Sequence, residues 1–286
     1  MNKIKLIVSD IDGTILNEKC ECSTRVRRAL DEAQKLGIKV VLATGRMFMG
    51  ADPVRESLGL DTPVICYQGA MVRQGNDILY QNAVDNSLAR EIIRISREYG
   101  FHLNLYNNDT LIVEDDNKQY MKDYTQGRFT TYEVVESFDD VELGDVSKLL
   151  CITYNEDEII NLQKELSKQF EGKLAIVRSH KYYLEFTDIK ATKGNAMNFL
   201  KDLWNIKTEE VFASGDQDND YDLLKNAGVK IAMGNASEKL KSIADYICPT
   251  INEDGLADAI EKYVLNPAGV SGFYDKQNAF STEGSK

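Results

Sequence analysis

The chain has 286 residues, of which 46 are acidic and 34 basic, and its formal net charge is −12. This acidic balance argues against a partner that is nucleic acid or an anionic membrane surface, because binders of both normally present basic faces. No apolar stretch approaches the about 18 residues of a membrane-spanning helix, and the apolar N-terminal run is too short for a signal peptide. We therefore expect a cytoplasmic protein.

The histidines and cysteines limit the possible chemistry. His102 and His180 stand far apart in the sequence, so a zinc site built on histidines is not expected, and nothing marks either as the base of a Ser–His–Asp triad. The five cysteines are odd in number and scattered, which is typical of reduced thiols in the cytoplasm. If the protein is an enzyme, we expect carboxylates to carry the reaction.

The first segment of the chain predicts strands and a helix in alternation. Residues 4–9, 38–43 and 64–67 form short apolar runs that favour buried strands. Apolar residues at helical spacing predict a helix over 26–33, and Gly37 is placed to end it. Strands that are apolar throughout and separated by a helix indicate a parallel sheet covered on both faces.

The middle of the chain, between about residues 82 and 187, has a different pattern. Helices are expected over 87–99 and 157–170. Strand-like segments occupy residues 102–106, 110–113, 148–154, 174–177 and 182–186. This mixture of helices and hairpin-like strands predicts an α+β domain inserted into the first one.

The last segment returns to the alternating pattern. A helix that contains Ala196 and Leu200 precedes a strand over 211–214. The elements expected after it are a helical piece at 223–224, a strand over 229–232, a helix around Leu240, a strand at 246–247 and a helix over 256–264. We therefore predict an α/β fold, a Rossmann-like doubly wound parallel sheet, with a core of residues 1–82 and 188–265, an inserted domain of 83–187 and a loosely ordered tail of 266–286.

Four short motifs follow strands or open helices of the predicted α/β core, where ligands bind in folds of this kind. The first is Asp10-Ile11-Asp12-Gly13-Thr14. Its two aspartates can face one cleft if the backbone turns at Gly13, and then one carboxylate can attack while the other handles a proton. Taken alone, the motif is also compatible with an ordinary Asp-Gly turn.

The next two motifs carry groups suited to a phosphate. Thr44-Gly45-Arg46 offers a hydroxyl, a backbone amide and a guanidinium, although a turn before a helix would also explain it. Lys193-Gly194 precedes a predicted helix, where a lysine opposes the helix dipole. One interpretation is that Lys193 neutralises an anionic site; the other, which the motif taken alone favours, is a solvated surface lysine.

The fourth motif is the acidic run Gly215-Asp216-Gln217-Asp218-Asn219-Asp220, which follows a predicted strand. Clustered oxygen donors at a strand end suit a hard cation such as Mg²⁺. The run lacks the spacing of an EF-hand, and a solvated acidic loop is the alternative. Together the four motifs supply a nucleophile, phosphate ligands, a charge neutraliser and a metal site.

These motifs, in this order, resemble motifs I to IV of the haloacid dehalogenase superfamily, and the resemblance covers about residues 2–265. The insertion after Gly69-Ala70 resembles the C2-type cap of its Cof-type sugar-phosphatase branch. Two segments near the C-terminus are also similar to that branch, Gly234-Asn235-Ala236 and Glu253-Asp254-Gly255. Two positions depart from its pattern, since Gln68 stands where the branch has Asn and Leu223 where it has Met.

The resemblance implies a Mg²⁺-dependent phosphatase that hydrolyses a small phosphorylated metabolite, a sugar phosphate or a phosphorylated cofactor, through an aspartyl-phosphate. Asp10 would attack phosphorus. Asp12, oriented by Thr14, would protonate the leaving oxygen and then activate water. Lys193 would offset the charge between Asp10 and the phosphoryl group.

The resemblance also implies the ligands. Thr44 and the amides of Gly45 and Arg46 would bind phosphate oxygens. The ligands implied for Mg²⁺ are Asp10, the carbonyl oxygen of Asp12, Asp216, Asn219 and Asp220.

Other functions and properties stay open at this point. A phosphotransferase or phosphomutase could use the same aspartyl-phosphate, and a receiver-like signalling module could hold a phosphoaspartate without turnover. Receivers are shorter and lack a large insertion. Tyr182-Tyr183 could face the substrate or pack in the inserted domain. We take a monomer as the default state.

Overall fold

The computed structural model describes residues 4–116, 118–125 and 130–269, so residues 270–286 of the predicted tail lie outside the described residues. The described chain divides into two compact units. The first draws on residues 4–43, 55–62 and 197–269, and the second on residues 44–54 and 63–196 with the gaps just given. The chain thus passes from the first unit into the second and back again.

The first unit is built on a parallel sheet. Its strands are β1 (Leu6–Ser9), β2 (Lys39–Ala43), β12 (Val211–Gly215), β13 (Val229–Ala232) and β14 (Tyr246–Ile247). They lie in the order β14-β13-β12-β1-β2, and each neighbouring pair is parallel. All of β1 and β12 is buried, as their continuous apolar runs predict. The predicted α/β parallel sheet is confirmed.

The helices of the first unit cover this sheet with apolar faces. Helix α1 (Thr24–Lys35) begins where the Ser23 hydroxyl accepts a hydrogen bond from the backbone of Val26 (3.1 Å), and it ends before Gly37, whose φ is +79°. Helix α1 packs against the C-terminal helix α9, and α7 packs on β12 and β13. Besides α1, the helices that lie wholly in the first unit are α7 (Tyr221–Lys225), α8 (Glu238–Lys241) and α9 (Gly255–Ile260). Helix α9 continues as a π-helical turn over Glu261–Leu265.

Two helices contribute residues to both units. Helix α6 (Lys193–Trp204) begins in the second unit and ends in the first. Helix α2 (Phe48–Ser57) begins in the second unit and also ends in the first. The sequence offered a helix here only as the alternative explanation of Thr44-Gly45-Arg46, because Gly50 and Pro53 lie inside α2 and interrupt the helical pattern.

The second unit contains an antiparallel run and a six-stranded sheet. The run is formed by β3 (Val64–Cys66), β4 (Met71–Gln74) and β5 (Asp77–Gln81). The sheet has the order β10-β11-β9-β6-β7-β8 and is antiparallel except between β7 and β8. Its strands are β6 (His102–Asn107), β7 (Thr110–Val113), β8 (Glu133–Val134), β9 (Val146–Ile152), β10 (Leu174–His180) and β11 (Tyr183–Asp188).

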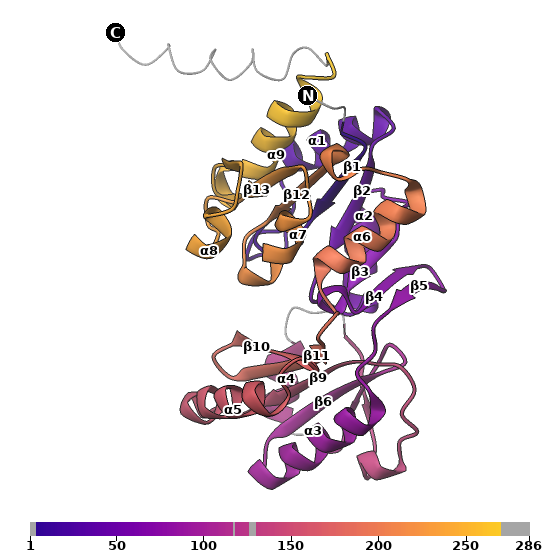
Figure 1. Ribbon diagram of the computed structural model, residues 1–286, viewed down its shortest axis with the longest axis vertical. Coiled ribbons are helices and arrows are strands. Elements are labelled where there is room, and N and C mark those ends of the chain that lie inside the picture. Colours follow the sequence, from indigo (N-terminus) through magenta and orange to yellow (C-terminus); the bar gives the residue numbers. More distant parts are fainter. Residues whose placement is uncertain (1–3, 117, 126–129, 270–286) are drawn as a thin grey trace. The chain divides into compact units, whose positions relative to one another are not determined.

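Helices α3 (Asn86–Tyr99) and α5 (Glu156–Gln169) pack on one face of the six-stranded sheet (Figure 1). The core beneath them includes Leu103 and Leu105 of β6. Tyr106 alternates with these leucines and therefore points to the other face. There its hydroxyl contacts that of Tyr124 in α4 (Lys118–Thr125), a helix that the sequence did not predict.

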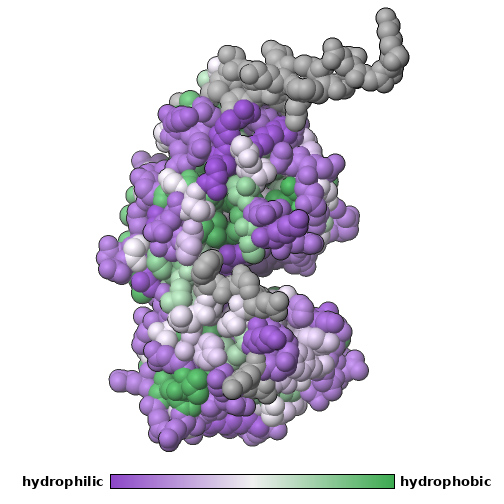
Figure 2. Space-filling view, turned by 180° about the vertical axis from the view of Figure 1, so that it is seen from behind, coloured by the Kyte–Doolittle hydropathy of each residue, from purple (hydrophilic) through white to green (hydrophobic). Residues whose placement is uncertain are grey.

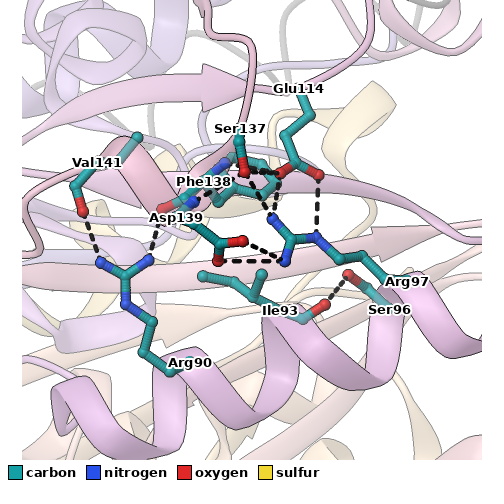
Figure 3. A network of polar contacts seen from close by, with 9 residues as sticks. All are labelled: Arg90, Ile93, Ser96, Arg97, Glu114, Ser137, Phe138, Asp139 and Val141. Carbon is teal, nitrogen blue, oxygen red and sulfur yellow. Dashed lines mark hydrogen bonds and ion pairs between the residues drawn. The ribbon is translucent and has the colours of Figure 1, made fainter.

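Two arginines of α3 fix the irregular segment that precedes β9 (Figure 3). Arg90 donates to the carbonyl oxygens of Phe138 and Val141, the latter at 2.6 Å. Arg97 pairs with the carboxylates of Glu114 and Asp139, the latter at 3.1 Å. A stretch of chain with little regular structure is thereby held to a helix by side chains.

The surface seen in Figure 2 is mostly hydrophilic, and hydrophobic areas are limited to a few places. Large apolar side chains that reach solvent include Ile160 of α5 and Val177 of β10. Among the residues that the structure describes, no helix has the length and apolar character needed to cross a membrane.

Candidate active site

Three buried carboxylates meet at the ends of β1 and β12 in the first unit. Asp10 follows β1, Asp216 follows β12, and Asp220 lies one turn further on. Each offers an oxygen within 4.8 Å of the other two, and none of the three residues is more than 6% exposed. The strand ends meet because β1 and β12 are parallel neighbours, and the backbone N–H of Asp10 donates to the carbonyl of Ser214 (3.0 Å).

This cluster fits a divalent cation. Three carboxylates packed together away from water repel one another, and each has lost much of its hydration. A bound cation relieves both costs, and carboxylate oxygens are the ligands that Mg²⁺ prefers. The donor set of Asp10, Asp216 and Asp220 therefore suits a magnesium ion.

The acidic loop after β12 is fixed by its own hydrogen bonds. One oxygen of Asp220 accepts from the backbone N–H groups of Asp216 (3.0 Å) and Gln217 (3.1 Å). The side-chain amide of Gln217 donates to Oδ2 of Asp216 (2.8 Å). Asn219 lies in the same short 3₁₀ turn and is half-buried. Gln217, which was not among the predicted site residues, thus orients one of the three clustered carboxylates.

The loop after β1 packs directly against this acidic loop. Gly13 has φ +83°, and a Cβ on it would lie 2.4 Å from Oδ2 of Asp216, so only glycine fits here without displacement. Asn235 donates to the carbonyl of Gly13 (2.9 Å) and accepts from the backbone N–H of Ile251 (2.9 Å). The Asn235 side chain therefore ties the loop of the first motif to the C-terminal part of the unit.

The other two polar residues of the first motif differ in exposure. Asp12 is exposed to solvent, in contrast to Asp10. Thr14 is fully buried, and in the described part of the chain its hydroxyl oxygen has no hydrogen-bond partner. A buried hydroxyl in this state is costly unless a ligand or water completes it.

The second motif follows β2 and belongs to the second unit. Thr44 is buried, and its hydroxyl accepts a hydrogen bond from the backbone N–H of Arg46 (3.1 Å). The Arg46 guanidinium donates to the carbonyl of Gly50 (3.2 Å), and both Gly45 and Arg46 are half-buried. The turn is thus formed by its own residues and by the start of α2.

Lys193, the first residue of α6, is fully buried rather than a solvated surface lysine. The loop of residues 67–69 lies against it. A Cβ on Gly69 would approach the carbonyl oxygen of Thr192 to 2.1 Å and the backbone nitrogen of Lys193 to 2.6 Å. The same loop touches the second motif, since the backbone N–H of Gln68 donates to the carbonyl of Thr44 (3.0 Å).

The structure therefore gathers the predicted site residues into two groups. The first and fourth motifs meet in the first unit, and the second motif and Lys193 are joined through the 67–69 loop in the second unit.

Comparison with known proteins finds haloacid dehalogenase-like hydrolases and phosphatases. A family profile described as haloacid dehalogenase-like hydrolase matches residues 7–260. A haloacid dehalogenase-like hydrolase of solved structure from Bacteroides thetaiotaomicron is 32% identical, with a TM-score of 0.83, over 91% of this chain and 99% of that one. Phosphatase YwpJ of Bacillus subtilis (strain 168) is 30% identical over 279 residues, 89% of this chain and 98% of its own.

A second relative carries a more specific name. The 5-amino-6-(5-phospho-D-ribitylamino)uracil phosphatase YcsE of Bacillus subtilis (strain 168) is 30% identical over 263 residues. The match covers 92% of this chain and 96% of that protein.

Proposed function

Because the chain belongs to the haloacid dehalogenase-like hydrolases, in their Cof-type branch, and is a phosphatase of that family, we propose that it hydrolyses a small phosphorylated metabolite in a Mg²⁺-dependent reaction through an aspartyl-phosphate on Asp10. The observation that carries this proposal is the buried cluster of Asp10, Asp216 and Asp220. Asp10 follows β1, which lies between β12 and β2, and the carboxylates of Asp216 and Asp220 lie close to it; this arrangement supports Asp10 as the nucleophile of a metal-assisted reaction.

The reaction has two steps on the protein's own residues. In the first, a carboxylate oxygen of Asp10 forms a bond to phosphorus, the bond to the leaving oxygen breaks, and Asp12 gives that oxygen a proton. In the second, Asp12 takes a proton from water, whose oxygen attacks phosphorus and releases Asp10 and inorganic phosphate. Burial of Asp10 and exposure of Asp12 fit these roles, because the proton carrier exchanges with solvent.

Mg²⁺ would be held by Asp10, Asp216 and the carbonyl of Asp12, with Asn219 and Asp220 contributing directly or through the other ligands. When bound, the ion reduces the repulsion between the Asp10 carboxylate and the phosphate dianion. The hydrogen bonds from Gln217 and to Asp220 keep the acidic loop in one conformation while this charge changes.

The phosphate ligands in this proposal are the Thr44 hydroxyl and the amides of Gly45 and Arg46. Lys193 balances the negative charge of Asp10 and the phosphoryl group. Its full burial supports this role, because a buried ammonium needs an anionic partner to be stable. Thr14, whose buried hydroxyl has spare hydrogen-bonding capacity among the described residues, orients Asp12.

Residues 83–187 act as the cap that selects the substrate in this proposal. Sugar phosphates, phosphorylated cofactors and 5-amino-6-(5-phospho-D-ribitylamino)uracil form the first panel of substrates, the last because YcsE is named for it. A ranking of this panel by kcat/KM identifies the substrate class. Action as a monomer in the cytoplasm stays a prediction, tested by sedimentation and by fractionation.

The test of the proposal is release of inorganic phosphate from a small aryl phosphate, with and without Mg²⁺. We expect release by the wild-type protein, none by Asp10→Asn, and loss after metal chelation that added Mg²⁺ restores. Calorimetry should show Mg²⁺ binding to the wild type that weakens in Asp216→Asn. Full activity of Asp10→Asn would refute the nucleophile, and phosphate passed to an added sugar instead of water would favour a transferase.

A further inference from the structure

The loop of residues 67–69, which joins the second motif to Lys193, has an unusual backbone. Tyr67, Gln68 and Gly69 have φ values of +51°, +60° and +100°. Left-handed conformations are rare for residues with a side chain, and rarest for bulky ones such as tyrosine. A strained conformation of this kind persists only where the surroundings hold it, and such strain concentrates at functional sites.

Contacts of the Tyr67 side chain keep the 67–69 loop in this conformation. Tyr67 is fully buried, and its hydroxyl donates to Oδ1 of Asp109 at 2.6 Å. The other oxygen of Asp109 forms an ion pair with Arg73 of β4, the strand that follows the loop. Burial and the nearby Asp109 carboxylate raise the pKa of the Tyr67 hydroxyl well above its usual value, so the proton that it donates stays in place.

Asp109 belongs to a different part of the sequence, 42 residues further along, in the turn between β6 and β7. That turn is itself fixed, because the side chain of Asn108 accepts from the backbone N–H of Asp145 (2.9 Å) and its backbone N–H donates to the Asp145 carbonyl (3.0 Å). The position of the Asp109 carboxylate is therefore fixed by contacts within residues 83–187.

The 67–69 loop in turn contacts the proposed phosphate ligands. The backbone N–H of Tyr67 donates to the carbonyl of Arg46 (3.0 Å), and that of Gln68 donates to the carbonyl of Thr44. On its other side, Gly69 lies so close to Thr192 and Lys193 that no side chain fits between them. A shift of Tyr67 would therefore move or release both the second motif and the start of α6.

We propose that Asp109 is a positioning residue: by accepting from Tyr67 and pairing with Arg73, it holds the 67–69 loop, and through it Thr44–Arg46 and Lys193, in the geometry that binds the phosphoryl group. The inference rests on the proposed function. It couples the turn between β6 and β7 in the predicted cap to the phosphate ligands, so the phosphate site is complete only while this turn is docked on Tyr67.

The experiment compares inorganic phosphate, used as a competitive inhibitor, across matched variants in the aryl phosphate assay. Tyr67→Phe removes only the hydroxyl that Asp109 accepts from. We expect the inhibition constant of phosphate and the KM of the aryl phosphate to rise together about tenfold or more, as for loss of a hydrogen bond to a charged group. The Asp109→Asn variant keeps an acceptor for Tyr67 but loses the charge that pairs with Arg73, and we expect a smaller rise.

The double variant tests whether the two residues act as one unit. Tyr67→Phe combined with Asp109→Asn should raise the inhibition constant no more than Tyr67→Phe alone, because without the Tyr67 hydroxyl the Asp109 side chain has no hydrogen bond to the 67–69 loop left to weaken. The control is Tyr106→Phe. Tyr106 is also buried, its ring packs edge-on against Tyr67 at 5.6 Å, and its hydroxyl bonds to Tyr124 rather than Asp109. We expect it to lower the melting temperature similarly and leave phosphate inhibition unchanged.

Two outcomes overturn the inference. Either Tyr67→Phe binds phosphate like the wild type, or Tyr106→Phe weakens phosphate as much as Tyr67→Phe does. Failure of the proposed function is distinguishable, since the wild-type protein would then release no phosphate or Asp10→Asn would remain active. If Tyr67→Phe does not fold, the Asp109→Asn variant decides, because its side chain has the same size as the original. Phosphate inhibition of Asp109→Asn equal to that of the wild type would then overturn the inference.

Discussion

Replacement of Gly13 by alanine tests whether the loop of the first motif sets the position of Asp216. The new Cβ would lie 2.4 Å from Oδ2 of Asp216, whereas ordinary contacts begin at 3.4 Å, so the carboxylate must retreat by about 1 Å. That oxygen also accepts from the side-chain amide of Gln217 at 2.8 Å, a bond that resists the shift. A misplacement of about 1 Å at a reacting centre can cost about 100-fold in rate.

We expect kcat/KM of Gly13→Ala to fall about 100-fold, with a higher Mg²⁺ concentration for half-maximal phosphate release. The φ of +83° adds backbone strain, which destabilises the fold by about 1–2 kcal/mol. Gly37→Ala is the matched control, because Gly37 has φ +79° but nothing within 4 Å of the new Cβ. It should lose similar stability in urea unfolding and keep full activity. Equal activity of the two variants at every Mg²⁺ concentration would refute the reasoning.

Three further predictions concern stability and reactivity. Arg25→Ala leaves the carboxylate of Glu261, which is 1% exposed, without its guanidinium. Urea unfolding should show a loss of about 3 kcal/mol, near the low end for a buried pair because Arg25 reaches solvent, whereas Arg94→Ala, at an exposed ion pair, should leave the free energy of unfolding nearly unchanged. Burial lowers the pKa of His102, so below about pH 6.5 the unfolded chain binds more protons than the folded one. The free energy of unfolding should therefore fall from pH 7 to pH 5. The same dependence of unfolding free energy on pH in His102→Gln would contradict this. An alkylating reagent should label the exposed Cys20 first, as read by mass spectrometry. Burial keeps the reagent from the thiols of Cys66, Cys151 and Cys248 and raises their pKa. Early labelling of one of these three in the native protein would contradict this prediction.

The sequence predicted the elements whose pattern is local and missed those that depend on distant contacts. The bounds predicted for β7 and β13 agree with the structure, because both strands are short apolar runs between turns. The hairpin of β4 and β5 was missed, since Ile78 and Leu79 are 46% and 36% exposed and carry no alternating signal. Helix α4 was missed for a similar reason, as its apolar positions face side chains of β6 rather than a continuous core.

The candidate site divides in the same way. Asp10 and Asp216 could be picked out from the sequence because each directly follows an apolar strand. Gln217 could have been noticed as the neighbour of Asp216, but nothing in the sequence says that its amide turns back to that carboxylate. The contact between Tyr67 and Asp109 depends on how a turn 42 residues away packs, which no local pattern contains.

The pairing of β1 with β12 has a consequence for how the protein is made. Ser9 and Ser214 lie side by side in the sheet, yet 205 residues separate them in the chain. At about 5–20 residues per second, a ribosome needs about 10–40 s to make that stretch. During this time the edge of β1 that pairs with β12 has its backbone N–H and C=O groups without their strand partner, and Asp10 is present without Asp216 or Asp220. The carboxylate cluster is therefore assembled late in synthesis, and a nascent chain that stops short of β12 has the proposed nucleophile without the other two carboxylates of the proposed metal site.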